Sequence, residues 1–207
     1  MKRIIFFASL CLSHSLAAEP QPTDFGPNAT LIEVDTAPLS PDQQTGLANF
    51  KEDASYFGAF YVSVTGEEWY YSYGYHSISA AKQLANRGCS LQDEPAVECR
   101  LHAVVLPAGA DVADDTLAGF SQFASEDFSD DYAKAQEPGT FSAFAISGGG
   151  EYGWTAGWDT WEDALASAMA YCEADADSSL AGFSIATRRW AQEKGFNTCR
   201  VIDVQNP

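Results

Sequence analysis

Positive charge is scarce in this chain of 207 residues. It carries 11 lysines and arginines against 29 aspartates and glutamates, which gives a formal net charge of -18 at pH 7. Such a surface repels the phosphate groups of nucleic acids and of anionic membranes, so we expect neither as a partner. It would attract a cationic protein, although acidic surfaces are also common in soluble proteins from salty habitats.

The patterns that hold a metal ion are also missing. The cysteines show no Cys-x-x-Cys spacing, and His76 and His102 belong to no ligand pattern, which argues against a zinc site. The alternating acids Glu173, Asp175 and Asp177 lack the glycine and the glutamate of a calcium-binding loop, so we expect a solvated acidic loop there. The sequence predicts no metal and no cofactor.

Nor does the sequence contain an assembled catalytic set. No Gly-x-Ser-x-Gly motif supplies a nucleophile that a histidine and an orienting acid could activate. The stretch Ser147–Gly150 has the glycines of a phosphate-binding loop, but no P-loop lysine follows it. A hairpin turn explains these glycines better. We therefore name no catalytic residue.

Long apolar runs are missing after the first few residues. Lys2 and Arg3 precede a short apolar run at Ile4–Leu12, and Ser15-Leu16-Ala17 has the small-x-small pattern of a signal-peptidase site. The run is far shorter than the ~20 residues that cross a bilayer as a helix. Residues 1–18 are therefore predicted to be a cleaved signal peptide. The mature protein is then periplasmic or secreted, with no membrane insertion.

What the chain does contain is an internal repeat. Residues 59–107 carry an Ala-Phe-x-aliphatic-Ser motif, an aromatic Gly-Tyr stretch, an alanine-rich helix ending in cysteine, and Cys-Arg before a last strand. Residues 143–207 carry the same series in the same order, which indicates two copies of one unit. The predicted organisation is signal peptide 1–18, extended leader and short helix 19–55, repeat one 56–107, helical linker 108–138 and repeat two 139–207.

The repeat also orders the cysteines. Cys11 lies in the signal segment and is expected to leave with it, and the even number that remains indicates disulfide bonds in an exported chain. Four cysteines allow three pairings. Cys89 and Cys172 occupy one equivalent position, and the second cysteine of each copy occupies the other. The repeat therefore selects the pairs Cys89–Cys99 and Cys172–Cys199.

Each repeat is predicted to fold as β-β-α-β. Two strands are followed by a helix, which Ser77 caps and Cys89 ends in the first copy and which Cys172 ends in the second, and then by a last strand. The fold class is α+β, with the two units forming one mixed sheet, helices packed on one face and one disulfide in each repeat. A further helix is expected in the linker, from about Ser121 to Lys134.

The motifs of the repeat also carry a family resemblance. In the first copy the relevant residues are Gly58–Ser63, Gly74, Ala81, Ala85, Cys89 and Cys99-Arg100, and in the second they run from Ala143 through Cys199. They resemble a family of exported bacterial domains of unknown function. Its members share a Gly-Ala-aliphatic-Ala-aliphatic-Ser strand, a helix with spaced alanines ending in cysteine, and a second cysteine before the last strand. The resemblance implies two tandem copies of this domain, and it carries over no catalytic residue.

Exported proteins of this kind are sometimes labelled aminolevulinate synthase, a label that the residues do not support. A pyridoxal phosphate enzyme needs a large cofactor domain and a buried lysine for the Schiff base. The lysines beyond the signal segment all lie in polar contexts, namely Lys51, Lys82, Lys134 and Lys194.

Aromatic residues crowd the second strand of each repeat. Alternate residues of a strand share a face, so part of each set is exposed if the sheet is covered on one side only. Exposed aromatic side chains suit sugar rings or a protein partner, whereas core packing is the simpler explanation. The candidate binding residues are Tyr73, Trp154 and Trp158. Arg100 and Arg200, which recur beside the disulfides, are candidates for binding an anion or for anchoring an acidic loop.

The leading hypothesis from the sequence is an exported, non-enzymatic binding or interaction module. Its partner would be a cationic protein or a glycan. A specific form is inhibition of a cationic envelope hydrolase such as a lysozyme, driven by the acidic surface and anchored by aromatic side chains. A small hydrolase acting on glycans or peptidoglycan is the alternative, although carboxylate pairs say little in a chain with 29 acids. A structural envelope protein is the third hypothesis.

Overall fold

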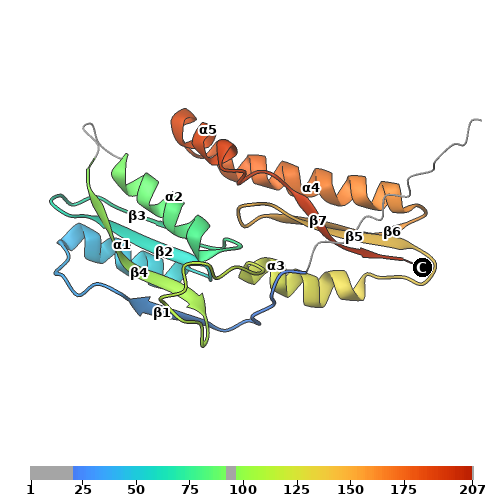
Figure 1. Cartoon of the computed structure of the whole chain (residues 1–207), viewed down its shortest axis with the longest axis horizontal. Helices are drawn as coiled ribbons and strands as arrows, with labels where there is room; N and C mark the ends of the chain where they lie inside the picture. Colours follow the sequence, from blue (N-terminus) through green and yellow to red (C-terminus); the bar gives the residue numbers. More distant parts are fainter. Residues whose placement is uncertain (1–20, 92–96, 207) are drawn as a thin grey trace, which may run out of the picture.

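The computed structural model describes residues 21–91 and 97–206 of the chain, which form an α+β protein with two antiparallel sheets. The two sheets lie one after the other along the long axis of the molecule (Figure 1). The expected signal peptide, residues 1–18, lies outside the described residues. No helix in the described part of the chain has the length and apolar character needed to cross a bilayer.

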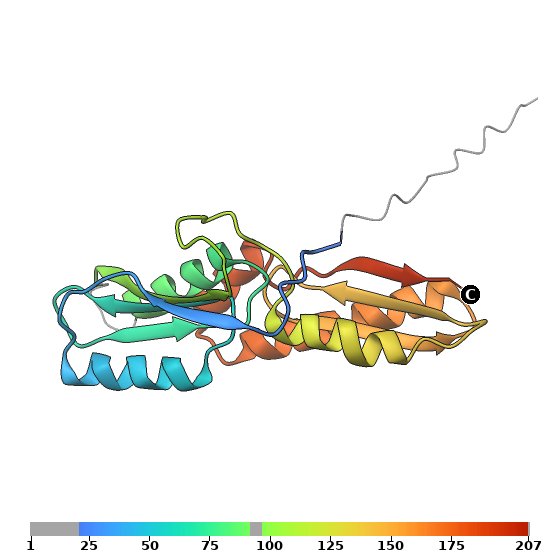
Figure 2. The same cartoon turned by 90° about the horizontal axis from the view of Figure 1, so that it is seen from below.

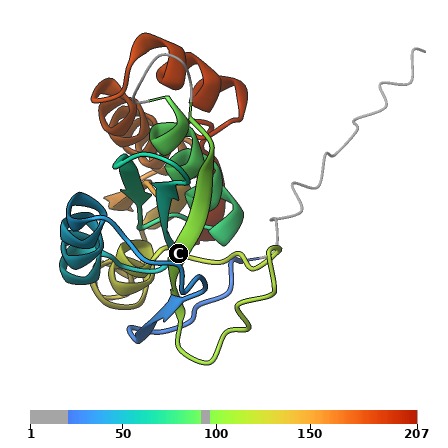
Figure 3. The same ribbon diagram turned by 90° about the vertical axis from the view of Figure 1, so that its left-hand side faces the viewer.

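The first half of the chain builds a four-stranded sheet. Its elements are β1 (Ala29–Glu33), α1 (Pro41–Asp53), β2 (Gly58–Ser63), β3 (Trp69–Ser72), α2 (Ile78–Ser90) and β4 (Cys99–Pro107). The strands follow the order β1-β4-β2-β3, and each neighbouring pair is antiparallel. Helices α1 and α2 lie on opposite faces of this sheet (Figures 2 and 3).

The second half builds a three-stranded sheet. Its elements are α3 (Gln122–Asp127), the π-helical turn η1 (Phe128–Tyr132), β5 (Phe141–Ile146), β6 (Tyr152–Trp158), α4 (Trp161–Ala181), α5 (Ile185–Glu193) and β7 (Arg200–Gln205). The strand order is β6-β5-β7, again antiparallel throughout. In each sheet the first hairpin strand has the second hairpin strand on one side and the strand that follows the helix on the other.

Several helices begin where the sequence places a capping side chain. The hydroxyl of Ser77 accepts a hydrogen bond from the amide of Ala80, as expected for the start of α2. Ser121 caps α3 in the same way through the amide of Ala124. The expected linker helix therefore forms, and it continues from α3 into η1.

The central strands are covered on both faces, so the expectation of helices on one face only is wrong. In β5, Phe144 and Ile146 pack in one cluster with Tyr132 of η1. Ala143 and Ala145 point to the other side and pack against the alanines of α4. Because apolar residues occupy consecutive positions of this strand, both of its faces must be shielded from water. The small residues on the second face let α4 lie close to the sheet.

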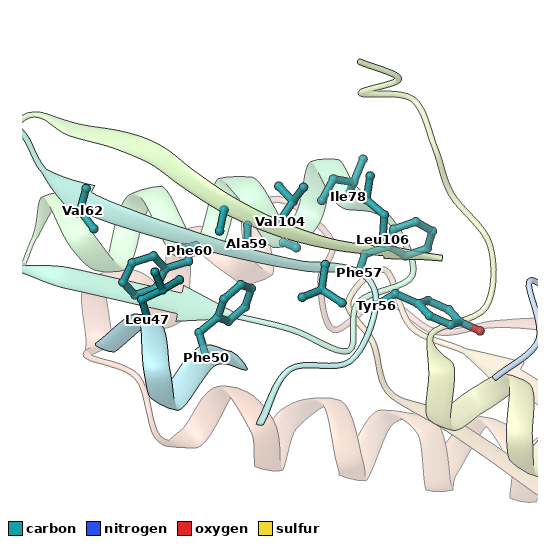
Figure 4. Packing of buried hydrophobic residues seen from close by; sticks show 14 residues of the cluster. Leu47, Phe50, Tyr56, Phe57, Ala59, Phe60, Val62, Ile78, Val104 and Leu106 are labelled. Carbon is teal, nitrogen blue, oxygen red and sulfur yellow. The ribbon is translucent and has the colours of Figure 1, made fainter. Parts of the chain in front are cut away.

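The largest hydrophobic cluster lies in the first half (Figure 4). Phe50 of α1 stacks on Phe60 of β2, with ring centroids 5.7 Å apart, and both side chains are fully buried. Helix α2 closes the opposite face with Ile78 and Ala81. The hydroxyl of Ser72 in β3 donates a hydrogen bond to the Ala81 carbonyl at 2.7 Å, which fixes this helix on the sheet.

The expectation of one mixed sheet is also wrong, because the two halves meet end to end. Strand β1 occupies the outer edge of β4, and the Gly-rich turn before β6 abuts the chain after β3. A Cβ atom on Gly150 would collide with the carbonyl oxygen of Gly74, so only glycine allows this approach. The amide of His76 donates to the carbonyl of Gly149 at 2.8 Å across the same junction.

Helix α4 is longer than expected. It does not end at Cys172 but continues to Ala181, and Gly182 follows it. No proline or glycine interrupts the stretch between Cys172 and Gly182, so the acidic residues expected in a loop extend the helix. Helix α5, which the sequence analysis did not predict, then fills part of the remaining disulfide loop.

Both expected disulfides are confirmed. Cys89 is bonded to Cys99 and Cys172 to Cys199, so each bridge joins the helix of one half to the last strand of that half, or to the residue just before it. The two bridges span 10 and 27 positions of the sequence. All four cysteines of the described residues are therefore used within their own half.

Candidate functional site

An open groove of about 530 Å³ lies beside β6, where the two halves of the molecule meet. Both halves contribute to its walls. The described residues that line it are Tyr73, Gly74, Phe123, Asp127, Gly150, Glu151, Tyr152, Gly153, Trp154, Tyr171 and Asp175. Five of these eleven are aromatic and three are acidic, so the groove combines flat apolar surfaces with negative charge.

Strand β6 forms the floor of the groove. Successive side chains of a strand point to opposite faces, so Tyr152 and Trp154 share one face and Gly153 points to the other. Tyr152 stacks on Phe144 with ring centroids 5.6 Å apart, which fixes the face on which the two aromatic rings lie. Gly153 lies directly under α4, where a Cβ atom would meet the carbonyl oxygen of Ala168 at 2.6 Å.

Helix α3 forms the wall on the aromatic side. Phe123 and Asp127 are four residues apart and therefore lie on the same face of the helix. The Asp127 carboxylate accepts a hydrogen bond from the indole Nε1 of Trp154 at 3.2 Å. Burial raises the pKa of Tyr152, and its hydrogen bond to Asp127 raises it further. One carboxylate thus holds two aromatic side chains of the strand.

Helix α4 forms the opposite wall. Tyr171 and Asp175 are again four residues apart and line the groove together. Tyr171 is 58% exposed, which is unusual for so large a side chain on a helix with a buried alanine face. Both residues reach the groove because α4 passes over β6, and Asp175 does so because the helix continues beyond Cys172.

The first half of the molecule contributes Tyr73, which follows β3 directly. Tyr73 stacks on Tyr71 with centroids 6.1 Å apart, and Tyr71 stacks on Trp69 at 5.9 Å. The hydroxyl of Tyr71 donates to the carboxylate of Asp53 at 2.7 Å, and this bond raises the pKa of Tyr71 to about 12. A row of stacked rings therefore leads along β3 to the groove.

Charge in the groove has one sign. Asp127, Glu151 and Asp175 line it, whereas no lysine or arginine is found among its described lining residues. A second hollow, of about 430 Å³, lies at the far end of the aromatic row, beside Trp69, and is lined by Asp42 and other acidic residues. Both hollows thus place acidic side chains beside aromatic rings.

His76 lies behind the groove and forms hydrogen bonds to the residues at its rim. Its Nδ1 accepts a hydrogen bond from the amide of Ser121 at 2.8 Å, so the ring proton is on Nε2, which faces the carbonyl of Glu151 at 3.2 Å. The hydroxyl of Ser121 donates to the carbonyl of Gly150 at 3.0 Å. Burial lowers the pKa of His76 to about 4, so the ring is neutral at physiological pH.

The glycine turn before β6 is a hairpin turn. Its amides are already engaged, since Gly148 donates to the carbonyl of Thr198 and Gly149 to that of Phe196. The amide of Gly150 lies 3.1 Å from a carboxylate oxygen of Glu151. These amides therefore hold the strands and the turn together, and they do not form the amide cradle of a phosphate-binding loop.

The five binding candidates from the sequence lie in different places. Tyr73 and Trp154 both line the groove. Trp158 lies at the far end of β6, where its indole donates to the hydroxyl of Thr155. Arg100 forms an ion pair with Asp35 of the N-terminal segment. Arg200 is exposed and lines a smaller hollow, of about 260 Å³, together with His76.

Sequence reasoning did not name the groove residues on the two helices as binding candidates, which are Phe123, Asp127, Tyr171 and Asp175. Asp175 was expected to lie in a solvated acidic loop. Phe123 and Tyr171, which are the i, i+4 partners of Asp127 and Asp175, are exposed aromatic residues. That pairing was a usable signal once both segments were known to be helical.

Three of the four lysines among the described residues have acidic partners. Lys51 pairs with Glu33 at 2.7 Å, and Lys82 and Lys134 each pair with an aspartate.

Comparison with known proteins gives no match for the chain, whether among protein-family models, curated proteins or solved structures.

Proposed function

We propose that the chain is an exported, non-enzymatic binding module that takes a cationic protein partner in the groove beside β6. The observation that carries the proposal is the composition of the groove, in which five aromatic and three acidic residues converge without a basic one among the described lining residues. Aromatic side chains dominate the energetics of protein interfaces, and complementary charge accelerates association and selects partners.

Export is part of the proposal. It is supported by the signal-like N-terminal sequence and by the two disulfides, which persist in oxidising compartments. In the cell envelope, basic hydrolases such as lysozymes are partners of suitable charge. Inhibition of such an enzyme is the specific form that we favour.

We also propose that the two halves are copies of one ancestral β-β-α-β unit of the exported domain family described above. The proposal is supported by the matching strand order of the two sheets and by the equivalent positions of the two disulfides. Duplication explains why the groove lies at a junction, since two units placed end to end create a concave surface that neither unit has alone.

The test is binding of the purified mature chain to a panel of basic envelope hydrolases, measured at low and high salt. Tyr73→Ala combined with Tyr171→Ala should weaken binding at least tenfold, because both rings are exposed in the groove. Trp161→Ala is the matched control, since it removes an exposed aromatic ring outside the groove. Absence of any partner at low salt would count against the proposal.

Glycan hydrolysis is the second candidate, favoured by one observation. Exposed aromatic faces lie beside several carboxylates in the groove, and glycosidases use such rings to stack sugars and paired carboxyl groups for acid–base chemistry. An activity screen on peptidoglycan and common glycosides, with Asp175→Asn as the variant, separates the two. If the unaltered chain hydrolyses a glycan and this variant does not, glycan hydrolysis would replace binding as the proposed function.

A further inference from the structure

We infer that the partner enters the groove as an extended basic segment that pairs with β6 as an added strand. This inference rests on the proposed function and adds the mode of recognition. Strand β6 is an edge strand, since the order of its sheet is β6-β5-β7. Edge strands present unpaired amides and carbonyls that can template another chain.

The hydrogen-bonding phase of β6 shows which groups point outward. The amide of Ser147 donates to the carbonyl of Glu151 at 2.8 Å, so this pair bonds across the hairpin. Bonded and non-bonded pairs alternate along an antiparallel ladder, so Gly153 and Thr155 also bond toward β5. The amides and carbonyls of Tyr152 and Trp154 therefore point away from β5, toward the open edge.

These outward groups are unoccupied in the described part of the molecule. No hydrogen bond from another described residue reaches the main-chain amide or carbonyl of Tyr152 or Trp154. Both residues line the groove, so the edge opens into it. The groove thus offers a short ladder of two donors and two acceptors along one strand.

The walls of the groove suit the alternation of an added strand. A chain beside β6 would lie about 4.8 Å from it and point its side chains alternately to the two faces of the sheet. On one face it would meet α3, with Phe123 and Asp127, and on the other it would meet α4, with Tyr171 and Asp175. Each wall therefore offers one aromatic ring and one carboxylate.

The charge of the groove decides what kind of chain fits. Three carboxylates and a formal net charge of -18 favour a segment that carries lysine or arginine. A second copy of this chain would bring its own acidic groove and be repelled. A neutral glycan would use the rings but neither the charge nor the main-chain ladder.

The experiment uses the mature chain and a fluorescent hexapeptide of alternating lysine and valine. Two further peptides carry N-methyl groups, one on alternate amides and one on every amide. Strand addition predicts that the fully methylated peptide binds at least tenfold more weakly, while the alternately methylated peptide, which keeps one free edge, binds like the parent. Equal affinity of all three peptides would overturn the strand-pairing inference.

Two variants of α4 distinguish a failure of the strand-pairing inference from a failure of the proposed function. Asp175→Lys changes a groove residue, and Glu173→Lys makes the same charge change on the same helix outside the groove. We expect at least a tenfold loss of affinity for the first and less than a twofold loss for the second. If the three peptides bind equally and only Asp175→Lys weakens their binding, the result supports a cationic ligand in the groove and contradicts the added strand.

Four other outcomes would contradict more than the strand pairing. Equal effects of the two variants, or no peptide binding at all, would contradict the proposed function itself. Displacement of the peptide by a chitin or peptidoglycan oligosaccharide at lower concentration than by free peptide would assign the groove to a glycan. Concentration-dependent dimerisation in sedimentation, abolished by Asp175→Lys, would assign the edge to a second copy.

Discussion

The amide of Ser121 donates a hydrogen bond to Nδ1 of His76, 2.8 Å away, and so joins the linker to the loop that precedes α2. The other ring nitrogen faces the carbonyl of Glu151 in the second half. One buried imidazole thus connects three segments that are distant in sequence, and it can do so only while Nδ1 is unprotonated. The rim of the groove depends on that protonation state.

Acid should therefore destabilise the protein through His76. The folded state lowers the pKa of this residue from 6.5 to about 4 because burial disfavours the charged ring. Its stabilising effect is complete above pH 6.5 and is lost as the pH falls toward 4, where the unfolded chain binds the extra proton. The loss amounts to about 3 kcal/mol at the acid end. Urea unfolding from pH 7.5 to 4.5 measures it.

The variant His76→Asn provides the control for this pH effect. Asparagine keeps a hydrogen-bonding side chain but does not titrate, so the variant should be less stable at pH 7.5 and should lose less stability on acidification. The remaining slope belongs to the carboxylates and to His102, whose pKa is also lowered by burial. An unchanged slope in the variant would mean that His76 is not the acid-sensitive group.

The two disulfides should contribute unequally to stability. Replacing either pair by alanine should cost roughly 2–4 kcal/mol, since each bridge restricts the unfolded chain. The Cys172–Cys199 bridge spans 27 positions and the Cys89–Cys99 bridge spans 10. The dependence of loop entropy on length then makes the longer bridge worth about 1 kcal/mol more. Denaturant unfolding of the two double variants tests this order, which a larger loss from the shorter loop would contradict.

Gly153 should not tolerate alanine. The added methyl group would collide with the backbone nitrogen of Cys172 and the carbonyl oxygen of Ala168, and neither can move without shifting α4. We expect a loss of about 2 kcal/mol or more in the free energy of unfolding. Gly182→Ala is the matched control, because its Cβ position is open and the change should be neutral or slightly stabilising. Similar midpoints for both variants would contradict the close packing of α4 on β6.

Asp127 should matter to the order of the groove. Asp127→Ala leaves the Trp154 indole and the Tyr152 hydroxyl without their shared acceptor, which should cost about 1–2 kcal/mol. Near-ultraviolet circular dichroism should show weaker aromatic signals as the rings gain freedom. Asp130→Ala removes a nearby exposed acid that pairs with Lys134 on the surface, and should change stability by less than about 0.5 kcal/mol. Equal effects would mean that Asp127 is an ordinary surface charge.

Local signals in the sequence predicted the elements better than their assembly. Ser77 and Ser121 began helices as capping residues do, and the repeat identified both disulfides. These features depend on a few neighbouring residues or on comparison of the two predicted repeats. The extension of α4 past Cys172 was missed because acidic residues were taken to indicate a loop, although alanines between them favour a helix.

Assembly depended on contacts that no local pattern contains. The approach of Gly150 to Gly74 places the two sheets end to end, and a sequence shows only that both residues are glycine. The groove needs Tyr73 from one half and Tyr171 from the other, which become neighbours only through that junction. Consecutive apolar residues in β5 did contain the information that both faces are covered, but the alternation rule for half-exposed strands was applied instead.

The placement of the disulfides has one more consequence. Each bridge closes on its own half, so the connection across the junction consists of the linker and of non-covalent contacts such as those of Leu84 with Leu180 and Phe196. Residues 111–116 of the linker are exposed, so the chain can be cut there between the two halves. The gene could therefore be split there into two separately translated pieces, each with both cysteines of its own bridge, and reassembly of the pieces would report directly on the strength of the junction.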